Sequence, residues 1–225
     1  MKKIALLLLA AVTALAALAD THYKSQIFVG ARGGVSMGMM SFSPSVKQSW
    51  NMGSTGAVSV RYTEEKLFGI VGEFGWVTRG WKENFEEHPL SYSRSLTYLN
   101  LPILTQIRFG SRRFKTFINL GPQFAYMIGS SISSDFDYNN PASVAGFPAN
   151  RQTEQLKLDV KNKFDYGICA GIGFEFFVQP RHSVILEARY YYGLGNIFPA
   201  RKADYFSASR NMSLEVTLGY SFRLK

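Results

Sequence analysis

Cysteine and histidine are scarce in this chain of 225 residues, which has one cysteine and three histidines. Because Cys169 is alone, no disulfide can form within the chain, and its place on a polar strand face predicts a free, buried thiol. The histidines, His22, His88 and His182, share no strand face with a serine and an acid in triad order. No group of His, Cys and Asp has the spacing of metal ligands. We therefore expect no enzyme, no catalytic residue, no metal and no cofactor.

Long apolar runs are missing after the N-terminus. No run beyond residue 19 approaches the roughly 18 apolar residues of a transmembrane helix, which excludes a helical membrane protein. The first residues differ, because Lys2 and Lys3 precede an apolar stretch and residues 17–19 form an A-x-A cleavage site. This pattern predicts a secretory signal peptide over 1–19 and one exported domain over 20–225.

Acidic residues are fewer than basic ones, 16 against 25, and the formal net charge is +9. A basic balance often indicates nucleic-acid binding, but an exported protein rarely meets nucleic acid, so none is expected as a partner. Lipid phosphates or acidic cell-surface sugars are the anions that such a chain would meet. The excess is also expected if Arg and Lys line the rims of a barrel.

Alternation of apolar and polar residues is abundant. In the closing stretch, RNMSLEVTLGYSFRLK, every second residue from Met212 to Leu224 is apolar, and Glu215 and Arg223 lie between them. A period of two is typical of a β-strand, because successive side chains point to opposite faces. Eight such strands are predicted, over 26–40, 52–62, 67–79, 95–109, 113–128, 163–178, 182–195 and 210–224.

The connections between these strands alternate in length. Tight connections lie at 63–66, 110–112 and 179–181, and long ones at 41–51, 80–94, 129–162 and 196–209. Short periplasmic turns and long extracellular loops are typical of outer-membrane barrels. We therefore expect an all-β fold, an eight-stranded antiparallel up-and-down transmembrane β-barrel whose termini share the short-turn end.

A soluble barrel with the same strands is the alternative, and the strand faces distinguish the two. The polar faces are rich in glycine, with isolated Arg and Glu and very little Lys, which suits a narrow lumen better than a solvated surface. Aromatic residues gather at both ends of the apolar faces, as the girdles of a membrane barrel do. They are Tyr62, Phe68, Phe109, Phe114, Phe176, Tyr220 and Phe222 near the short turns, and Trp76, Tyr126, Phe164, Tyr166 and Tyr192 near the long loops. The apolar faces are therefore expected to contact outer-membrane lipid.

Nine charged residues on the polar faces form the predicted lumen charge network. Arg32, Glu73, Glu187, Arg189 and Glu215 are expected near mid-depth, and Arg61, Arg108, Glu175 and Arg223 nearer the periplasm. Charges held away from bulk water need partners, so Arg–carboxylate pairs are expected. Arg32 and Glu215 should meet where the first and last strands close the barrel, directly or through Arg189 and Glu187. A register shifted by two residues would instead make Glu187 or Glu73 the main partner of Arg32. The network would fill and rigidify the barrel, and a path for protons or solutes is the alternative.

The long loops carry aromatic residues that are candidates for a partner-binding surface, because loops on rigid scaffolds often carry function. These residues are Trp81, Phe85, Phe136, Tyr138 and Phe147. The alternative is that they pack over the mouth of the barrel. Helical periodicity is indicated only around 154–160, within one of these loops.

Four stretches resemble a known family. They are FVGARGGVSM, YLNLPILTQIRFG, FINLGPQFAYMIG and LEVTLGYSFRL. Together they resemble the PorT-like family of small outer-membrane β-barrels, over roughly residues 27–224. The resemblance implies an accessory role in the type IX secretion system, which exports proteases and adhesins, with other secretion-system proteins as partners. It brings no catalytic motif.

Three functions are considered on these grounds. The first is an integral outer-membrane barrel that supports type IX protein secretion. The second is a small porin or a passive structural barrel, although the side chains that fill an eight-stranded barrel argue against a general porin. The third is a membrane-embedded hydrolase, which would need a serine, a histidine and an acid to meet in space.

Overall fold

The structure, a computed structural model, describes residues 24–64, 66–85, 88–148 and 151–224, so the predicted signal peptide lies outside the described residues. Eight long strands dominate it, and a two-residue strand, β2 (Gln48–Ser49), follows the first of them. The long strands are β1 (Gln26–Ser43), β3 (Asn51–Thr63), β4 (Phe68–Glu83), β5 (Tyr92–Gly110), β6 (Phe114–Ser134), β7 (Phe164–Gln179), β8 (His182–Gly193) and β9 (Ala208–Arg223). Each predicted strand is present.

The eight long strands close into a ring. Consecutive strands pair antiparallel, β4 with β5 included, and β1 pairs with β9 from Phe28–Arg223 to Ser43–Ala208. The predicted eight-stranded up-and-down barrel is therefore confirmed, and β2 is a small addition that pairs with the end of β4. Closure removes the sheet edges, which is required in a bilayer because lipid offers no hydrogen bonds.

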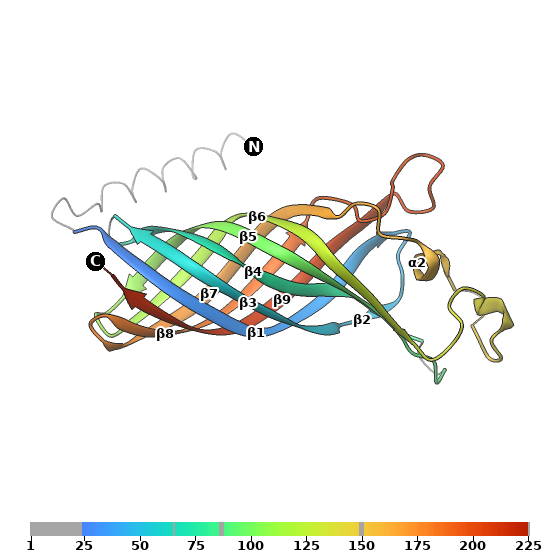
Figure 1. Ribbon diagram of the computed structural model, residues 1–225, viewed down its shortest axis with the longest axis horizontal. Coiled ribbons are helices and arrows are strands. Elements are labelled where there is room, and N and C mark those ends of the chain that lie inside the picture. The colour runs from blue at the N-terminus through green and yellow to red at the C-terminus, as the bar shows by residue number, and fades with distance from the viewer. Residues whose placement is uncertain (1–23, 65, 86–87, 149–150, 225) are drawn as a thin grey trace, which may run out of the picture.

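Short turns and long loops lie at opposite ends of the barrel. In Figure 1 the start of β1 and the end of β9 lie together at the left, while the long loops and the short helix α2 (Glu154–Lys157) lie at the right. The pairing of Phe28 with Arg223 places both described ends of the chain at the short-turn end, as predicted. Helix α2 falls within the stretch whose periodicity indicated a helix. No helix among the described residues is long and apolar enough to cross a bilayer.

The apolar strand faces point outward through the middle of the barrel. Leu186 on β8 is 50% exposed and Leu218 on β9 is 62% exposed, whereas Glu187 and Thr217, next to them in the chain, are buried. Such a belt would be unfavourable in water, because it exposes a large contiguous apolar surface. The apolar face therefore meets lipid and the polar face lines the lumen.

The strands on the loop side extend beyond the bilayer. β5 has 19 residues and β6 has 21, about twice the 9–11 that a tilted strand needs to cross the hydrocarbon. In these extensions apolar residues point inward and polar residues point outward, the reverse of the pattern within the membrane. Tyr92 and Leu96 on β5 point inward and are buried, while Ser93 and Ser95 point outward. The exchange follows from the surroundings, since the outer face meets water above the membrane. The predicted strand at 95–109 is therefore too short.

An apolar core fills the extracellular end of the barrel, which we call the cap. Its buried residues are Met40, Phe42, Val77, Trp81, Phe85, Tyr92, Leu96, Tyr98, Ala125, Met127, Leu156, Ile197, Phe198 and Phe206. They come from β1, β4, β5 and β6, from α2, from the loop after β4 and from the loop between β8 and β9. The cap resembles the core of a soluble protein, and it sits on top of a polar lumen.

Candidate functional site

The centre of the lumen is a cluster of two arginines and three glutamates. Arg189 on β8 donates from both terminal nitrogens to Glu73 on β4, at 2.6 and 2.7 Å, and its Nε donates to Glu187 at 2.6 Å. Arg32 on β1 donates from Nε to the same Glu73 at 3.0 Å. All these side chains are at least nine-tenths buried. Three neighbouring strands, β8, β9 with Glu215, and β1, therefore share one ion cluster with β4 on the opposite wall.

Glycine on the polar face makes room for this cluster. A Cβ atom at Gly171 on β7 would lie 2.7 Å from Cγ of Arg189 and 3.0 Å from Oε1 of Glu187. Any larger side chain would displace one of the charges from its partner. The glycine content that suggested a narrow lumen is thus a packing requirement.

The expected closure pair is present but is not the main contact. Nη1 of Arg32 lies 3.5 Å from Oε2 of Glu215, whereas Glu73 is closer and accepts the Nε hydrogen bond. In the sheet, Arg32 pairs with Gly219 and Glu215 pairs with Ser36. The two charges are offset along the seam, and Glu73 lies nearer the Arg32 guanidinium. The expected contact of Arg32 with Glu215 is therefore present, and the main partner is Glu73, one of the two alternatives that a shifted register would give.

A second cluster lies nearer the short-turn end. Arg61 on β3 donates to Glu175 on β7 at 2.6 Å, and Arg108 on β5 donates to the other oxygen of the same carboxylate. Ser183 adds a hydrogen bond of 2.7 Å, and the Arg61 guanidinium stacks over the Phe28 ring with its carbon 4.1 Å from the centroid. The structure places the side chain of the remaining predicted charge, Arg223, outside this cluster, half buried and without an ion pair to any described residue.

The two clusters carry opposite excess charges. The central one has two arginines and three glutamates, a net charge of −1, and the lower one has two arginines and one glutamate, a net charge of +1. A chain of amides joins them: Arg61 donates to Gln106 at 3.5 Å, Gln106 to Asn119 at 3.0 Å, and Asn119 to Glu187 at 2.6 Å. Every donor in this chain points from the positive cluster toward the negative one, so the amide dipoles favour both excess charges.

Little free space remains between the clusters. A cavity of about 30 Å³ is lined by Arg32, Arg61, Glu73, Asn119, Glu187 and Arg189 among others. That volume holds roughly two water molecules. The lumen at this depth is filled by side chains.

A third ion pair lies on the extracellular side of the centre and was missing from the predicted network. Arg79 on β4 donates to Asp165 on β7 at 3.0 Å, and its guanidinium stacks on Tyr191 at 3.7 Å. Asn211 donates to the same carboxylate at 3.0 Å. Parity along the strands is the signal that identifies this pair, since Arg79 is an even number of residues from Glu73 and faces the same way.

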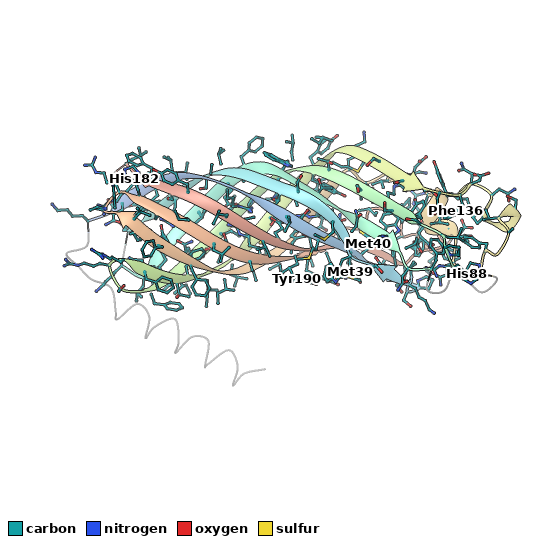
Figure 2. The ribbon with its side chains drawn as sticks, turned by 90° about the horizontal axis from the view of Figure 1, so that it is seen from below. Met39, Met40, His88, Phe136, His182 and Tyr190 are labelled. Atoms are coloured by element: carbon teal, nitrogen blue, oxygen red, sulfur yellow. The ribbon has the colours of Figure 1, made fainter. Side chains whose placement is uncertain are left out.

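The five loop aromatics do not form an exposed surface. Trp81 is fully buried and Phe85 is 3% exposed, and the other three pack as partly buried residues against the cap. The Phe85 ring meets Phe136 edge-on at 5.5 Å and Phe147 at 5.9 Å. Figure 2 shows Phe136 at the loop end, among the loops over the barrel mouth. These rings therefore pack over the mouth of the barrel, which was the alternative to a partner-binding surface, because packing removes their large apolar area from water.

Polar contacts fix the longest loop to the barrel wall beside the cap. The carboxylate of Glu83, at the end of β4, accepts from the indole of Trp81 at 3.1 Å, from Gln155 at 3.2 Å and from Arg151 at 3.3 Å. On the neighbouring strand, Arg94 donates to the carbonyl of Leu158 at 2.5 Å. The cap is therefore closed by directed bonds as well as by apolar packing.

Nucleophilic and metal-binding chemistry has no cluster among the described residues. Figure 2 shows His182 at the short-turn end and His88 at the loop end of the barrel, and His22 lies outside the described residues. His182 contacts the hydroxyl of Tyr220 on the outer face. Cys169 is buried beside Val71, Leu104 and Tyr191. No group of three potential metal ligands occurs in the described part of the chain.

A closed antiparallel barrel with a lipid-facing apolar belt and a charged interior defines an integral outer-membrane β-barrel protein. A family model described as the outer membrane protein beta-barrel domain matches residues 19–199, and the chain belongs to this family. That description names a fold and a location and carries no secretion role. No curated protein matches the chain.

Solved structures with a similar chain path include three bacterial outer-membrane proteins. OprG from Pseudomonas aeruginosa shares 10% identity, with 90% of this chain and 97% of that one covered and a TM-score of 0.48. Neisserial surface protein A shares 12% identity, with coverages of 89% and 99% and a TM-score of 0.45. The E. coli outer membrane protein W shares 13% identity, with coverages of 90% and 100% and a TM-score of 0.38.

Proposed function

We propose that this protein is a non-conducting outer-membrane barrel that acts through other proteins, as an accessory component of protein secretion by the type IX system. The closed lumen carries the first half of this proposal. Two ion clusters, the Arg79–Asp165 pair and the apolar cap follow one another along the barrel axis and leave a cavity of about 30 Å³ between the clusters. The resemblance to PorT-like barrels supports the second half.

A solute path through this lumen would be costly to open. Removing one partner from a buried ion pair typically costs about 3–5 kcal/mol, and a path would have to separate several such pairs. It would also have to displace Trp81 and its neighbours from the cap. These costs favour a function carried by the outer surfaces of the barrel.

Conductance separates this proposal from a porin. We expect the purified protein, refolded into planar lipid bilayers, to show no steady conductance above that of protein-free bilayers. Reproducible open channels in the unmodified protein would contradict the non-conducting barrel and favour a small porin.

A deletion strain separates a secretion role from a passive structural barrel. We expect loss of exported protease activity from the culture medium, with the proteases retained in the periplasm, while resistance to detergent and to large antibiotics is unchanged. Restoring the gene should restore export. Normal export together with a detergent-sensitive envelope would favour the passive barrel, and crosslinked pull-down from outer membranes would identify the secretion partners in the first case.

Export of the chain itself is part of this proposal. We infer that residues 1–19 direct secretion and are removed after Ala19. N-terminal sequencing of protein purified from outer membranes should then begin at Asp20. A chain that retains Met1 in the outer membrane would contradict this cleavage.

A further inference from the structure

A groove of about 640 Å³ lies on the outside of the barrel at its extracellular rim. Its residues come from the second half of β6, from the start of β7 with the segment before it, and from the segment that follows β8. The rim is low on this side, because β7 begins at Phe164 and β8 ends at Gly193 while β6 continues to Ser134. The segments before β7 and after β8 therefore lie against the upper end of the lipid-facing surface here.

The floor of the groove is aromatic and faces outward. Tyr126, Phe164 and Tyr166 line it, together with Leu194, and each of the four is more than one-third exposed. Outward-facing aromatic rings at the loop end of a membrane barrel mark the interface between hydrocarbon and headgroups of the outer leaflet. The floor is thus placed where lipid headgroups lie.

The wall above the floor is basic. Lys161 and Lys163 line the groove and are exposed, and neither forms an ion pair with a described residue. No acidic residue is among the described lining residues. The groove therefore joins a lipid-level aromatic surface to two ammonium groups with no acid in the groove itself, and the acids Asp159 and Asp204 lie in an adjoining pocket that Lys161 also lines.

The backbone that carries these lysines is held in place. Asn162, between them, donates from its side chain to the carbonyl of Asn196 at 2.8 Å and from its backbone to that of Ile197 at 3.2 Å. The carbonyl of Lys163 accepts from the backbone of Met127 at 2.8 Å. Such anchoring lowers the entropy cost of binding, because the loop is already ordered.

We propose that this groove binds one outer-leaflet lipid with a phosphorylated sugar headgroup, whose phosphates pair with Lys161 and Lys163 and whose acyl chains lie along the aromatic floor. Charge complementarity selects this occupant, since cations without acids at headgroup height attract phosphate. A second copy of the chain fits poorly, because the same two cations would face each other. The inference goes beyond the proposed function and does not depend on it.

Binding of diphosphorylated lipid A to the purified, detergent-solubilised full chain tests the proposal, with native mass spectrometry as the readout. We expect one lipid per barrel, and about tenfold or more weaker binding for the Lys161→Gln/Lys163→Gln double variant. A matched control is Arg112→Gln/Arg113→Gln, which removes two exposed cations from the short turn between β5 and β6. The control should bind as the unmodified protein does.

Two further ligands distinguish the sources of affinity. Dephosphorylated lipid A should bind at least tenfold more weakly than the diphosphorylated form, and the deacylated, water-soluble headgroup should bind more weakly than the intact lipid. Equal binding by the lysine variant and the unmodified protein, or equal loss in the turn control, would overturn the proposal. Equal binding of the soluble headgroup would overturn the lipid as occupant. Faster migration of unheated samples in gels verifies that each variant is folded.

Discussion

Arg189 and Glu73 join opposite walls of the barrel through two hydrogen bonds of 2.6 and 2.7 Å. Their strands, β8 and β4, are separated by three strands on either side of the ring, so no pair of strands is farther apart around it. Backbone pairing holds neighbouring strands, and this bidentate contact spans the diameter. The lumen charges therefore connect opposite walls of the barrel across its interior.

The first prediction compares the removal of a positive charge with the removal of a negative charge from the central cluster. Arg189→Met leaves three glutamates with one arginine and should lower the free energy of unfolding by about 3–5 kcal/mol. Glu73→Gln leaves two glutamates with two arginines and should cost clearly less. Urea unfolding in lipid vesicles measures both variants. Equal costs would show that charge balance does not decide stability here.

The second prediction ranks the partners of Arg32. A double-mutant cycle of Arg32→Met with Glu73→Gln should give a coupling of at least ~0.5 kcal/mol, because the two groups are hydrogen-bonded. The cycle with Glu215→Gln should give a smaller coupling, since the closest distance is 3.5 Å. A larger coupling to Glu215 would contradict the observed geometry.

The third prediction concerns depth in the bilayer. Leu218→Arg, within the aliphatic belt, should destabilise the barrel by about 2–4 kcal/mol, whereas Leu224→Arg, on the same outer face beyond the end of β9, should cost about 0–1 kcal/mol. Refolding into vesicles compares the two. Ser183, on the lumen face of β8, is an unsuitable control because it is buried and donates to Glu175. Equal tolerance at the two leucines would count against the membrane belt.

The fourth prediction concerns topology and the cap. Protease added to intact cells should cut the exposed part of the longest loop near Asn139 or Gly146 and spare the turn near Lys66, because only the loop end faces outward. Trp81→Ala should extend cleavage to α2, since removing a buried indole costs about 3–5 kcal/mol and loosens the cap. Cleavage confined to the short turns would reverse the assigned topology. An unchanged cleavage pattern in Trp81→Ala would show that α2 does not depend on this side chain.

The sequence by itself determined the strands, their order and their inner and outer faces within the membrane. A period of two is a local property, and the inward position of Glu215 and Glu187 follows from it without any knowledge of register. Eight of the nine predicted lumen charges, all except Arg223, lie in ion pairs. Arg79 and Asp165 obey the same parity and were within reach of the same reasoning.

Only the tertiary structure decided which charges meet and where the membrane pattern ends. Partners such as Arg189 and Glu73 come from strands on opposite walls, and their contact depends on the closed ring and its register, which no local pattern encodes. The burial of Trp81 and the outward serines of β5 depend on how far each strand rises above the bilayer. Alternation gives the period of a strand but not the solvent on either side of it. Outside the barrel, that solvent changes from lipid to water partway along the same strand. An apolar residue therefore points outward within the bilayer and inward above it.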